Sequence, residues 1–379
     1  MKRTAVVQIA QSSAYDFAWR GLRKFQDALA SVDRLMLERE VSSKQRPNLK
    51  KQMEQLAYCL RQAYEFSQSS KASGLSTKAL QAYYSITALA NAVILWAGNG
   101  LDAIDARHGK FHRHGLSLVQ AVSLEASGAS PDFDKNGTLT GLFGLWRRYA
   151  AHSPHYLKRS LDIPGHLGQS RYDISSELMP LSSIKMPNRP ISLVECLQHI
   201  PGLFLSLSSS PIKSKLVRGI ISDKLTYGED SIVASARKTV IVHPCHNDLL
   251  QPVLERFAYH PRHFEGLSIT PVQSGAAFTL TVTKELFDVP SSSPEIFPDT
   301  VDNLYFVGNG EFLNEFGYFY VGLYIIGMLS RYYPNIWMKE INKSSLMTIL
   351  CDEFIDSSLE RAPLNTLSTL DNCVFVYDR

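Results

Sequence analysis

Two strongly apolar segments near opposite ends of the 379-residue chain constrain its fold more than any other feature. The first runs from Leu80 to Trp96 and the second from Tyr318 to Leu329. Polar side chains such as Gln81 and Asn91 interrupt the first, and the second is shorter than the roughly 20 residues that cross a bilayer. We therefore expect two core helices. Because burying one leucine-sized side chain is worth about 1.5–3 kcal/mol, the two helices should pack together.

The remaining patterns predict helices on both sides of a strand-rich middle. Apolar residues recur at three- and four-residue steps from Tyr15 to Glu40, and a second helix is expected from Asn48 to Ser69. A helix from Thr140 to Ala151 should end before Pro154, because the residue before a proline is pushed out of the helical region. Runs rich in β-branched residues, including SIVASARKTVIVH and GLSITPVQSGAAFTLTVTK, predict three or more strands.

Together these patterns predict an α+β protein that is predominantly helical, with its N- and C-terminal helical regions packed together around a small strand-containing middle module. Four regions are expected. They are a basic helical region over 1–160, a connector with a short helix over 161–210, a strand-rich α+β module over 211–290, and a C-terminal helical region over 291–379 that packs on the first.

Charge is distributed unevenly along the chain. Residues 1–160 carry 22 Lys and Arg against 12 Asp and Glu, a net charge of +10, whereas residues 161–379 carry 17 against 24, a net charge of −7. A basic region favours a nucleic acid or another polyanion as partner, because clustered cations release counterions on contact. The alternative is intramolecular, with a basic domain resting on an acidic one or with charges spread over solvated helix faces.

The cysteines and the N-terminal segment indicate the cellular compartment of the protein. Five cysteines lie far apart, are odd in number and form no C-x-x-C pair, which argues for reduced thiols and against a disulfide framework. The apolar run near the N-terminus is brief, so a secretory signal is not expected. The sequence therefore predicts a cytoplasmic protein with no membrane partner. A homodimer is compatible with it.

Two histidine-rich stretches raise the question of a metal. His108, His112 and His114 lie within seven residues, and the stretch HPCHND spans 243–248. A structural zinc site uses four ligands at a recognisable spacing, whereas HPCHND also suits a turn that caps a helix. We therefore expect no metal. The signatures G-x-x-x-x-G-K-[ST] and G-x-S-x-G are absent, and no cofactor is expected.

Four short motifs occur in a fixed order along the chain. They are LQAYYSITALANAVIL at 80–95, RHGLSL at 113–118, DKNGTLTGLF at 134–143 and YVGLYIIGMLSRYYPNIWMKEI at 320–341. In this order they resemble the bacterial YaaC-like family, whereas the strand-rich middle matches only weakly. The resemblance implies a bacterial cytoplasmic protein. It carries over no catalytic residue, because the family has no assigned reaction.

The stretch RRYAAH at 147–152 resembles the Arg-x4-His motif of HEPN ribonucleases, small helical domains that cut RNA without a metal. The resemblance implies that His152 handles the proton of the attacking or leaving oxygen and that Arg147 stabilises charge on the phosphate. The two residues lie about 140° apart on a regular helix, so their convergence needs unwinding near Pro154. Arg107 and His112 share the spacing in an expected loop. The structural alternative is the polar end of a buried helix.

Two functions therefore stand as hypotheses. The first is a non-catalytic component that binds a protein partner or a nucleic acid, with Arg107, Arg113 and Arg148 as the nucleic-acid-binding residues. The second is a metal-independent HEPN-type ribonuclease effector, in a setting of anti-phage defence, with Arg147 and His152 as catalytic residues. Trp146, beside Arg148, could stack on bases, whereas the helical spacing of Trp19 predicts a core position.

Overall fold

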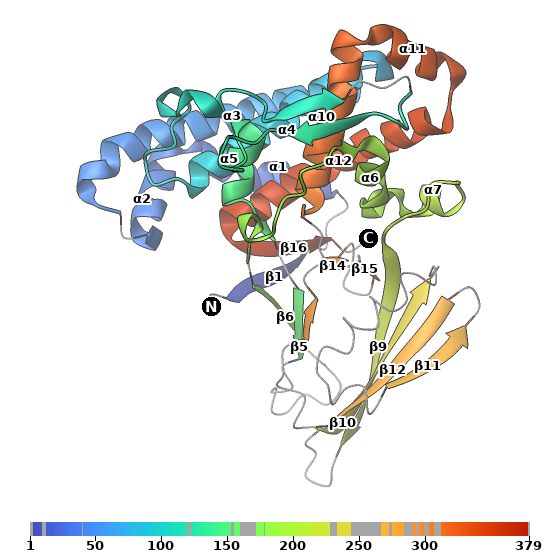
Figure 1. Cartoon of the computed structure of the whole chain (residues 1–379). Helices are drawn as coiled ribbons and strands as arrows, with labels where there is room; N and C mark the ends of the chain where they lie inside the picture. The colour runs from blue at the N-terminus through green and yellow to red at the C-terminus, as the bar shows by residue number, and fades with distance from the viewer. Residues whose placement is uncertain are drawn as a thin grey trace.

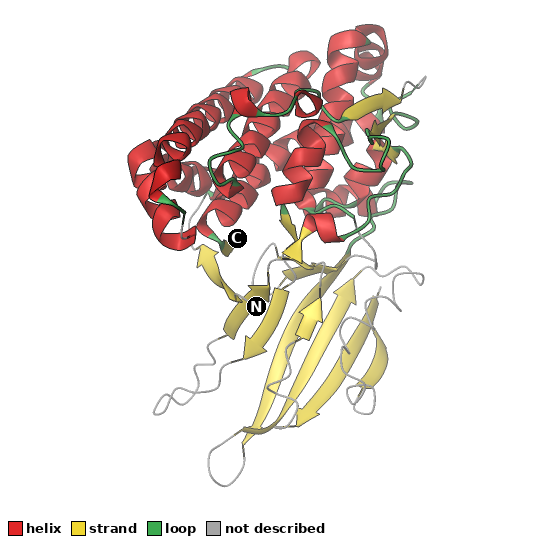
Figure 2. Ribbon diagram, turned by 60° about the vertical axis from the view of Figure 1, so that its left-hand side comes forward, coloured by secondary structure: helices red, strands yellow, loops and turns green. Residues whose placement is uncertain are grey.

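In the computed structural model of the chain, helices gather in one layer and the larger sheets lie beside it (Figures 1 and 2). The described residues are 3–9, 13–39, 41–119, 123–152, 155–159, 172–177, 179–227, 233–243, 267–272, 275–283, 291–293, 296–298, 303–306 and 312–377. The protein is mostly helical with smaller β parts, as the sequence predicted.

The helices follow the predicted pattern closely. The α-helices are α1 (Ala14–Arg23), α2 (Ala28–Arg39), α3 (Arg46–Ala72), α4 (Leu75–Ala97), α5 (Gly141–Tyr149), α6 (Leu193–Gln198), α7 (Phe204–Ser208), α10 (Glu315–Tyr332), α11 (Pro334–Lys343) and α12 (Leu346–Asp371). Short 3-10 helices are η1 (Lys24–Gln26), η2 (Ser43–Gln45), η3 (Ile104–Ala106), η4 (Gly109–Phe111), η5 (Leu181–Ser183) and η6 (Pro201–Leu203).

The helix expected from Tyr15 to Glu40 is instead two helices, α1 and α2, joined by η1. The cause is Asp27, whose carboxylate accepts hydrogen bonds from the backbone N–H groups of Leu29 and Ala30. This capping pattern starts a new helix.

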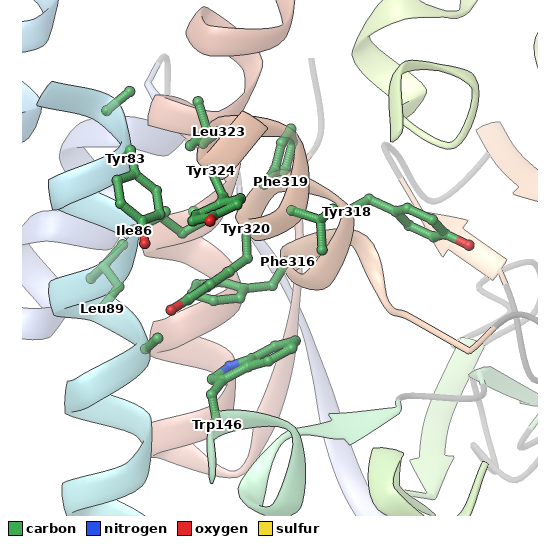
Figure 3. Packing of buried hydrophobic residues seen from close by; sticks show 14 of the residues in the cluster. Tyr83, Ile86, Leu89, Trp146, Phe316, Tyr318, Phe319, Tyr320, Leu323 and Tyr324 are labelled. Carbon is green, nitrogen blue, oxygen red and sulfur yellow. The ribbon is translucent and has the colours of Figure 1, made fainter. Parts of the chain in front are cut away.

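The two apolar helices that were predicted to pack together, α4 and α10, lie side by side in the core. Tyr83, Ile86 and Leu89 project from α4 toward Tyr320 and Tyr324 of α10 in Figure 3. By length and composition α4 also resembles a membrane span, yet 72% of its most apolar stretch is buried inside the molecule. Farther from this contact, α1 packs on α12, so both ends of the chain contribute to one core.

The strands form four sheets. The strands are β1 (Arg3–Ile9), β2 (Leu116–Val119), β3 (Gly128–Pro131), β4 (Ala151–His152), β5 (His155–Arg159), β6 (Tyr172–Glu177), β7 (Met179–Pro180), β8 (Ile191–Ser192), β9 (Val217–Tyr227), β10 (Val233–His243), β11 (Leu267–Val272), β12 (Gly275–Thr283), β13 (Ser291–Ser293), β14 (Ile296–Pro298), β15 (Asn303–Phe306) and β16 (Cys373–Tyr377). Their orders are β13-β5-β6-β1-β16, β11-β12-β10-β9-β15-β14, β2-β3-β8 and β4-β7.

The predicted strand-rich middle is confirmed by the antiparallel ladder of β9, β10, β11 and β12. Its sheet also takes in β14 and β15, which lie beyond residue 290. The boundaries of the four predicted regions stay a prediction.

The sequence analysis missed the strands at the two ends of the chain. β1 pairs in parallel with β16, and Ala5 lies opposite Cys373. Each strand is a short β-branched or aromatic run, RTAVVQI and CVFVY, that gains a partner only through long-range contact. This pairing brings the N- and C-terminal segments together.

Candidate anion-binding site

A cavity of about 640 Å³ lies beside α5. Three segments enclose it: the turn at 133–139, the outer face of α5 and the stretch at 182–188. Its charged lining consists of Asp134, Lys135, Arg147, Arg148 and Lys185. Four cations and one carboxylate thus meet in one hollow.

The turn at 133–139 is held by its own backbone and by Asp134. The Asp134 carboxylate accepts hydrogen bonds from the N–H groups of Asn136 and Thr138, each at 3.0 Å. These backbone hydrogen bonds, that of Thr138 first, lower the pKa of Asp134. The carboxylate is therefore committed to the turn, which leaves Lys135 exposed at its tip.

The start of α5 is fixed by a close approach of two backbone segments. Gly141 adopts φ +69°, and a Cβ there would lie 2.2 Å from the Cα of Gly115, so only glycine fits. The carbonyl groups of Arg113 and His114 accept hydrogen bonds from the N–H groups of Leu142 and Phe143, at 2.7 and 3.0 Å. The motifs RHGLSL and DKNGTLTGLF therefore serve to cap and position α5.

The inner face of α5 belongs to the core. Trp146 stacks on Phe316 and Tyr320, with ring centroids 5.2 and 5.9 Å apart, and is 1% exposed (Figure 3). A ring enclosed in this way is unable to reach a nucleic-acid base. Trp19 is also buried, as its helical spacing predicted.

Arg147, in the last turn of α5, is buried and only 4% exposed. Its Nε and Nη2 donate to the carbonyl of Phe312, at 3.4 and 3.2 Å, and Nη2 also donates to the carbonyl of Ile184. Burial lowers the pKa of Arg147 to about 10. Within the described part of the chain, Arg147 forms no ion pair with a carboxylate.

Arg148 lies on the outer face of α5 and is exposed. Its guanidinium lies over the ring of Phe111 in η4, 5.4 Å from the centroid, and the Lys110 ammonium approaches the same ring at 5.2 Å. Lys110 also lies 3.6 Å from the Asp134 carboxylate. We call Lys110, Lys135, Arg148 and Lys185 the basic rim. These four exposed cations surround the cavity or lie next to it.

The other two arginines proposed to bind nucleic acid differ in their surroundings. Arg107 is partly buried and donates to Asn91 Oδ1 at 2.5 Å and to the carbonyl of Asp102 at 3.2 Å. It thus holds a loop against α4. Arg113 is exposed beside the start of α5. The nucleic-acid-binding roles of Arg107, Arg113 and Arg148 stay predictions.

His152 lies in β4, opposite Met179 of β7, and its side chain lies outside what the structure describes. The catalytic pairing of Arg147 with His152 therefore stays a prediction. What the structure does supply is the surroundings of Arg147, whose guanidinium is held by two carbonyl groups.

Two histidines of the stretch 108–114 have hydrogen-bond partners within the fold. His114 Nδ1 is hydrogen-bonded to the Tyr83 hydroxyl at 2.7 Å, and the Nδ1 of His108 accepts from the N–H of Lys110. Within the described ranges, no group of three His, Cys, Asp or Glu residues gathers as metal ligands would. Residues 244–248 of HPCHND lie outside those ranges.

Sequence reasoning missed Lys135 and Lys185. Lys135 stands in a turn of the DKNGT stretch, and Lys185 in a segment treated only as a connector. Each is an ordinary surface lysine until the fold places it beside α5. No local pattern in the sequence distinguishes these two lysines, and the doublet Arg147-Arg148 marks only the α5 part of the site.

Comparison with curated proteins and with solved structures gives no match. The family comparison matches YaaC-like Protein over residues 29–370, a range that contains the cavity, α4 and nearly all of the C-terminal helices. The four motifs in their fixed order had suggested the same family. The chain therefore belongs to the YaaC-like protein family.

Proposed function

We propose that this YaaC-like protein binds nucleic acid through the basic rim and the cavity that it surrounds. One observation carries the proposal: four cations from three separate segments line one cavity, namely Lys135, Arg147, Arg148 and Lys185. Among the described lining residues the one carboxylate, Asp134, accepts hydrogen bonds from backbone N–H groups. The net charge of +10 over residues 1–160 supports a polyanionic ligand.

Nucleic acid suits this surface better than an acidic protein segment does. The rim cations are exposed lysines and an arginine, and their closest ion pair with a described residue is the 3.6 Å contact of Lys110 with Asp134. Phosphates along a nucleic-acid backbone neutralise such cations with release of counterions, without requiring a shaped apolar groove. A protein partner is the competing outcome of the experiment below.

The test is the salt dependence of binding to a fluorescent single-stranded RNA and to a DNA duplex. Each phosphate contact contributes about −0.7 to the slope of log K against log[salt] for single strands and about −0.9 for duplex DNA. The variant Lys135→Ala/Arg148→Ala/Lys185→Ala should therefore bind RNA more weakly and with a slope reduced by about 2.

A matched control removes the same charge elsewhere. Lys44 in η2, Arg61 in α3 and Lys339 in α11 are exposed and lie outside the cavity lining. The variant Lys44→Ala/Arg61→Ala/Lys339→Ala should keep most of the wild-type affinity and slope. Equal losses in the two triple variants would reject the basic rim as the site.

The same RNA distinguishes the ribonuclease hypothesis from the binding function. RNA is incubated with the protein in a chelator, beside His152→Ala. Cutting by the wild-type protein that disappears in His152→Ala would favour a metal-independent ribonuclease, whereas intact RNA in a bound complex supports the binding function. A place in the bacterial cytoplasm belongs to the proposal, whereas a role in defence against phage belongs to the ribonuclease alternative.

A further inference from the structure

We infer that the cavity beside α5 accepts a phosphate monoester, with Arg147 as its buried anchor and Arg148, Lys135 and Lys185 at its mouth. This inference rests on the proposed function of the same site and specifies its ligand. A nucleic-acid chain would then be bound by a phosphorylated end.

The first step is the unbalanced charge of Arg147. Arg147 is 4% exposed, and among the described residues only the carbonyl groups of Phe312 and Ile184 accept hydrogen bonds from its guanidinium. Carbonyl dipoles and the C-terminal end of α5, which supplies about half a negative charge, compensate it in part. A buried cation is otherwise paired with an anion, because isolated burial of a full charge is costly.

The second step is that Arg147 has donors to spare. Its Nη1 forms no hydrogen bond with any residue that the structure describes, while its side chain lines the cavity. Since Nε and Nη2 already donate to the two carbonyl groups, the N–H groups of Nη1 are the ones that would donate charge-assisted hydrogen bonds to a phosphate oxygen. The anion that Arg147 lacks inside the fold would therefore come with the ligand.

The third step concerns the charge and size of the ligand. Arg148, Lys135 and Lys185 add three positive charges to that of Arg147. A phosphate monoester carries about −1.5 to −2 at neutral pH, against −1 for an internal phosphodiester. A volume of about 640 Å³ lies in the range of small-molecule sites, about 300–1,000 Å³, so the cavity has room for the phosphate and its attached nucleoside.

The lining also offers neutral donors at the same place. Thr138, Ser182 and Asn188 line the cavity with hydroxyl and amide groups. The one lining carboxylate, Asp134, is bound by the N–H groups of Asn136 and Thr138 and lies near Lys110. Its repulsion of a phosphate is thereby reduced.

The experiment compares one RNA decamer carrying a 5′-phosphate, a 3′-phosphate or only hydroxyl ends, with a nucleoside 5′-monophosphate and the matching nucleoside as small ligands. We expect a phosphorylated end to bind at least about tenfold more tightly than hydroxyl ends, which is about 1.4 kcal/mol. The monophosphate, and not the nucleoside, should compete for the site.

The outcomes separate this inference from the proposed function. Equal affinity of phosphorylated and unphosphorylated RNA would overturn the inference and leave nucleic-acid binding in place. Binding of the monophosphate without binding of any RNA would support the phosphate monoester site and reject nucleic acid as its source. Absence of binding by every ligand would reject both.

Two variants link the preference to these residues. Arg147→Lys keeps a cation but loses the Nη1 group, which is held in place while Nε and Nη2 bind the two carbonyl groups, and it should abolish most of the preference for a phosphorylated end. Because Arg147 also holds two carbonyl groups, circular dichroism must show that the variant folds. Arg148→Gln alters only an exposed side chain and should reduce the preference severalfold, whereas the control Arg61→Gln on α3 should leave it unchanged.

Discussion

Two arginines contact the start of α10, and they are compensated in different ways. On one side, Arg361 of α12 forms hydrogen bonds of 3.0 to 3.3 Å with the carboxylate of Glu315, which Asn365 also contacts. On the other side, Arg147 of α5 donates hydrogen bonds to the carbonyl groups of Phe312 and Ile184 and forms no ion pair with a described residue. The first charge is neutralised within the fold, whereas the second is left open toward a cavity.

The two arginines therefore differ in whether a carboxylate of the protein neutralises their charge. The Arg361–Glu315 pair has side-chain exposures of 14% and 6%, and its two opposite charges neutralise each other. Arg147 is as deeply buried, but its positive charge has no anion among the described residues. This contrast supports our inference that an anion binds at the cavity beside Arg147.

The largest loss of stability is expected when the ion pair of Arg361 with Glu315 is broken. Replacement Arg361→Met leaves the Glu315 carboxylate buried without its cation, which should cost about 3–5 kcal/mol of unfolding free energy in urea denaturation at pH 7. The double variant Arg361→Met/Glu315→Leu should recover most of this loss, because no lone charge remains. Equal destabilisation of the two variants would contradict the interpretation of this pair as mutually compensating.

A smaller loss of stability is expected when Arg147 is replaced. Replacement Arg147→Met removes a donor from the carbonyl groups of Phe312 and Ile184 but strands no charge, so it should cost about 1–3 kcal/mol in the same assay. A loss larger than that of Arg361→Met would mean that an unseen anion compensates Arg147.

Tyr149, also on α5, should make the stability of the protein depend on pH in the alkaline range. Burial, and then its hydrogen bond to Asp102, raise the pKa of Tyr149 to about 12, whereas an unfolded tyrosine titrates near 10. Its contribution to stability is complete below pH 10 and is lost as pH rises through about 12. Urea denaturation at pH 9 and 11.5 should therefore show a shallower loss in Tyr149→Phe than in the wild-type protein.

Because Tyr149 is partly exposed to solvent, its effect on stability at alkaline pH should be small. Tyr149 is only half-buried, so the difference should stay well below the about 1.4 kcal/mol that each pKa unit of an enclosed group contributes. Identical pH profiles of the two proteins would show that Tyr149 titrates as it does in the unfolded chain.

The smallest effect is expected for a pair of the same chemistry at the surface. Arg189 contacts Glu195 through two hydrogen bonds of 2.7 Å, yet its side chain is 51% exposed. Arg189→Ala should cost about 0.5 kcal/mol or less, and less still in 0.5 M salt. A loss above about 2 kcal/mol, near that of Arg361→Met, would show that burial does not set the difference between the two pairs.

Much of the helical architecture could be predicted from local pattern. The apolar segments Leu80–Trp96 and Tyr318–Leu329 had to be buried, and both lie in the core as α4 and α10. The helix at 140–151 was predicted within a few residues, because a proline follows it. The pairing of β1 with β16 was not predictable, since strands that far apart carry no local signal of their partner.

The candidate site was only partly predictable. The doublet Arg147-Arg148 and the basic front indicated an anion, but the sequence did not show which arginine is buried. Lys135 and Lys185 stand 50 positions apart and become neighbours of α5 only in the folded chain.

The sequence by itself determined that this protein has two helices unable to remain in water, a basic front half and the motifs of its family, because composition and periodicity are local properties. The tertiary structure decided which charges are neutralised. Glu315 forms an ion pair with Arg361, whereas Arg147 donates to carbonyl groups beside a cavity and has no carboxylate partner in the described part of the chain. That distinction depends on distances between segments far apart in the chain.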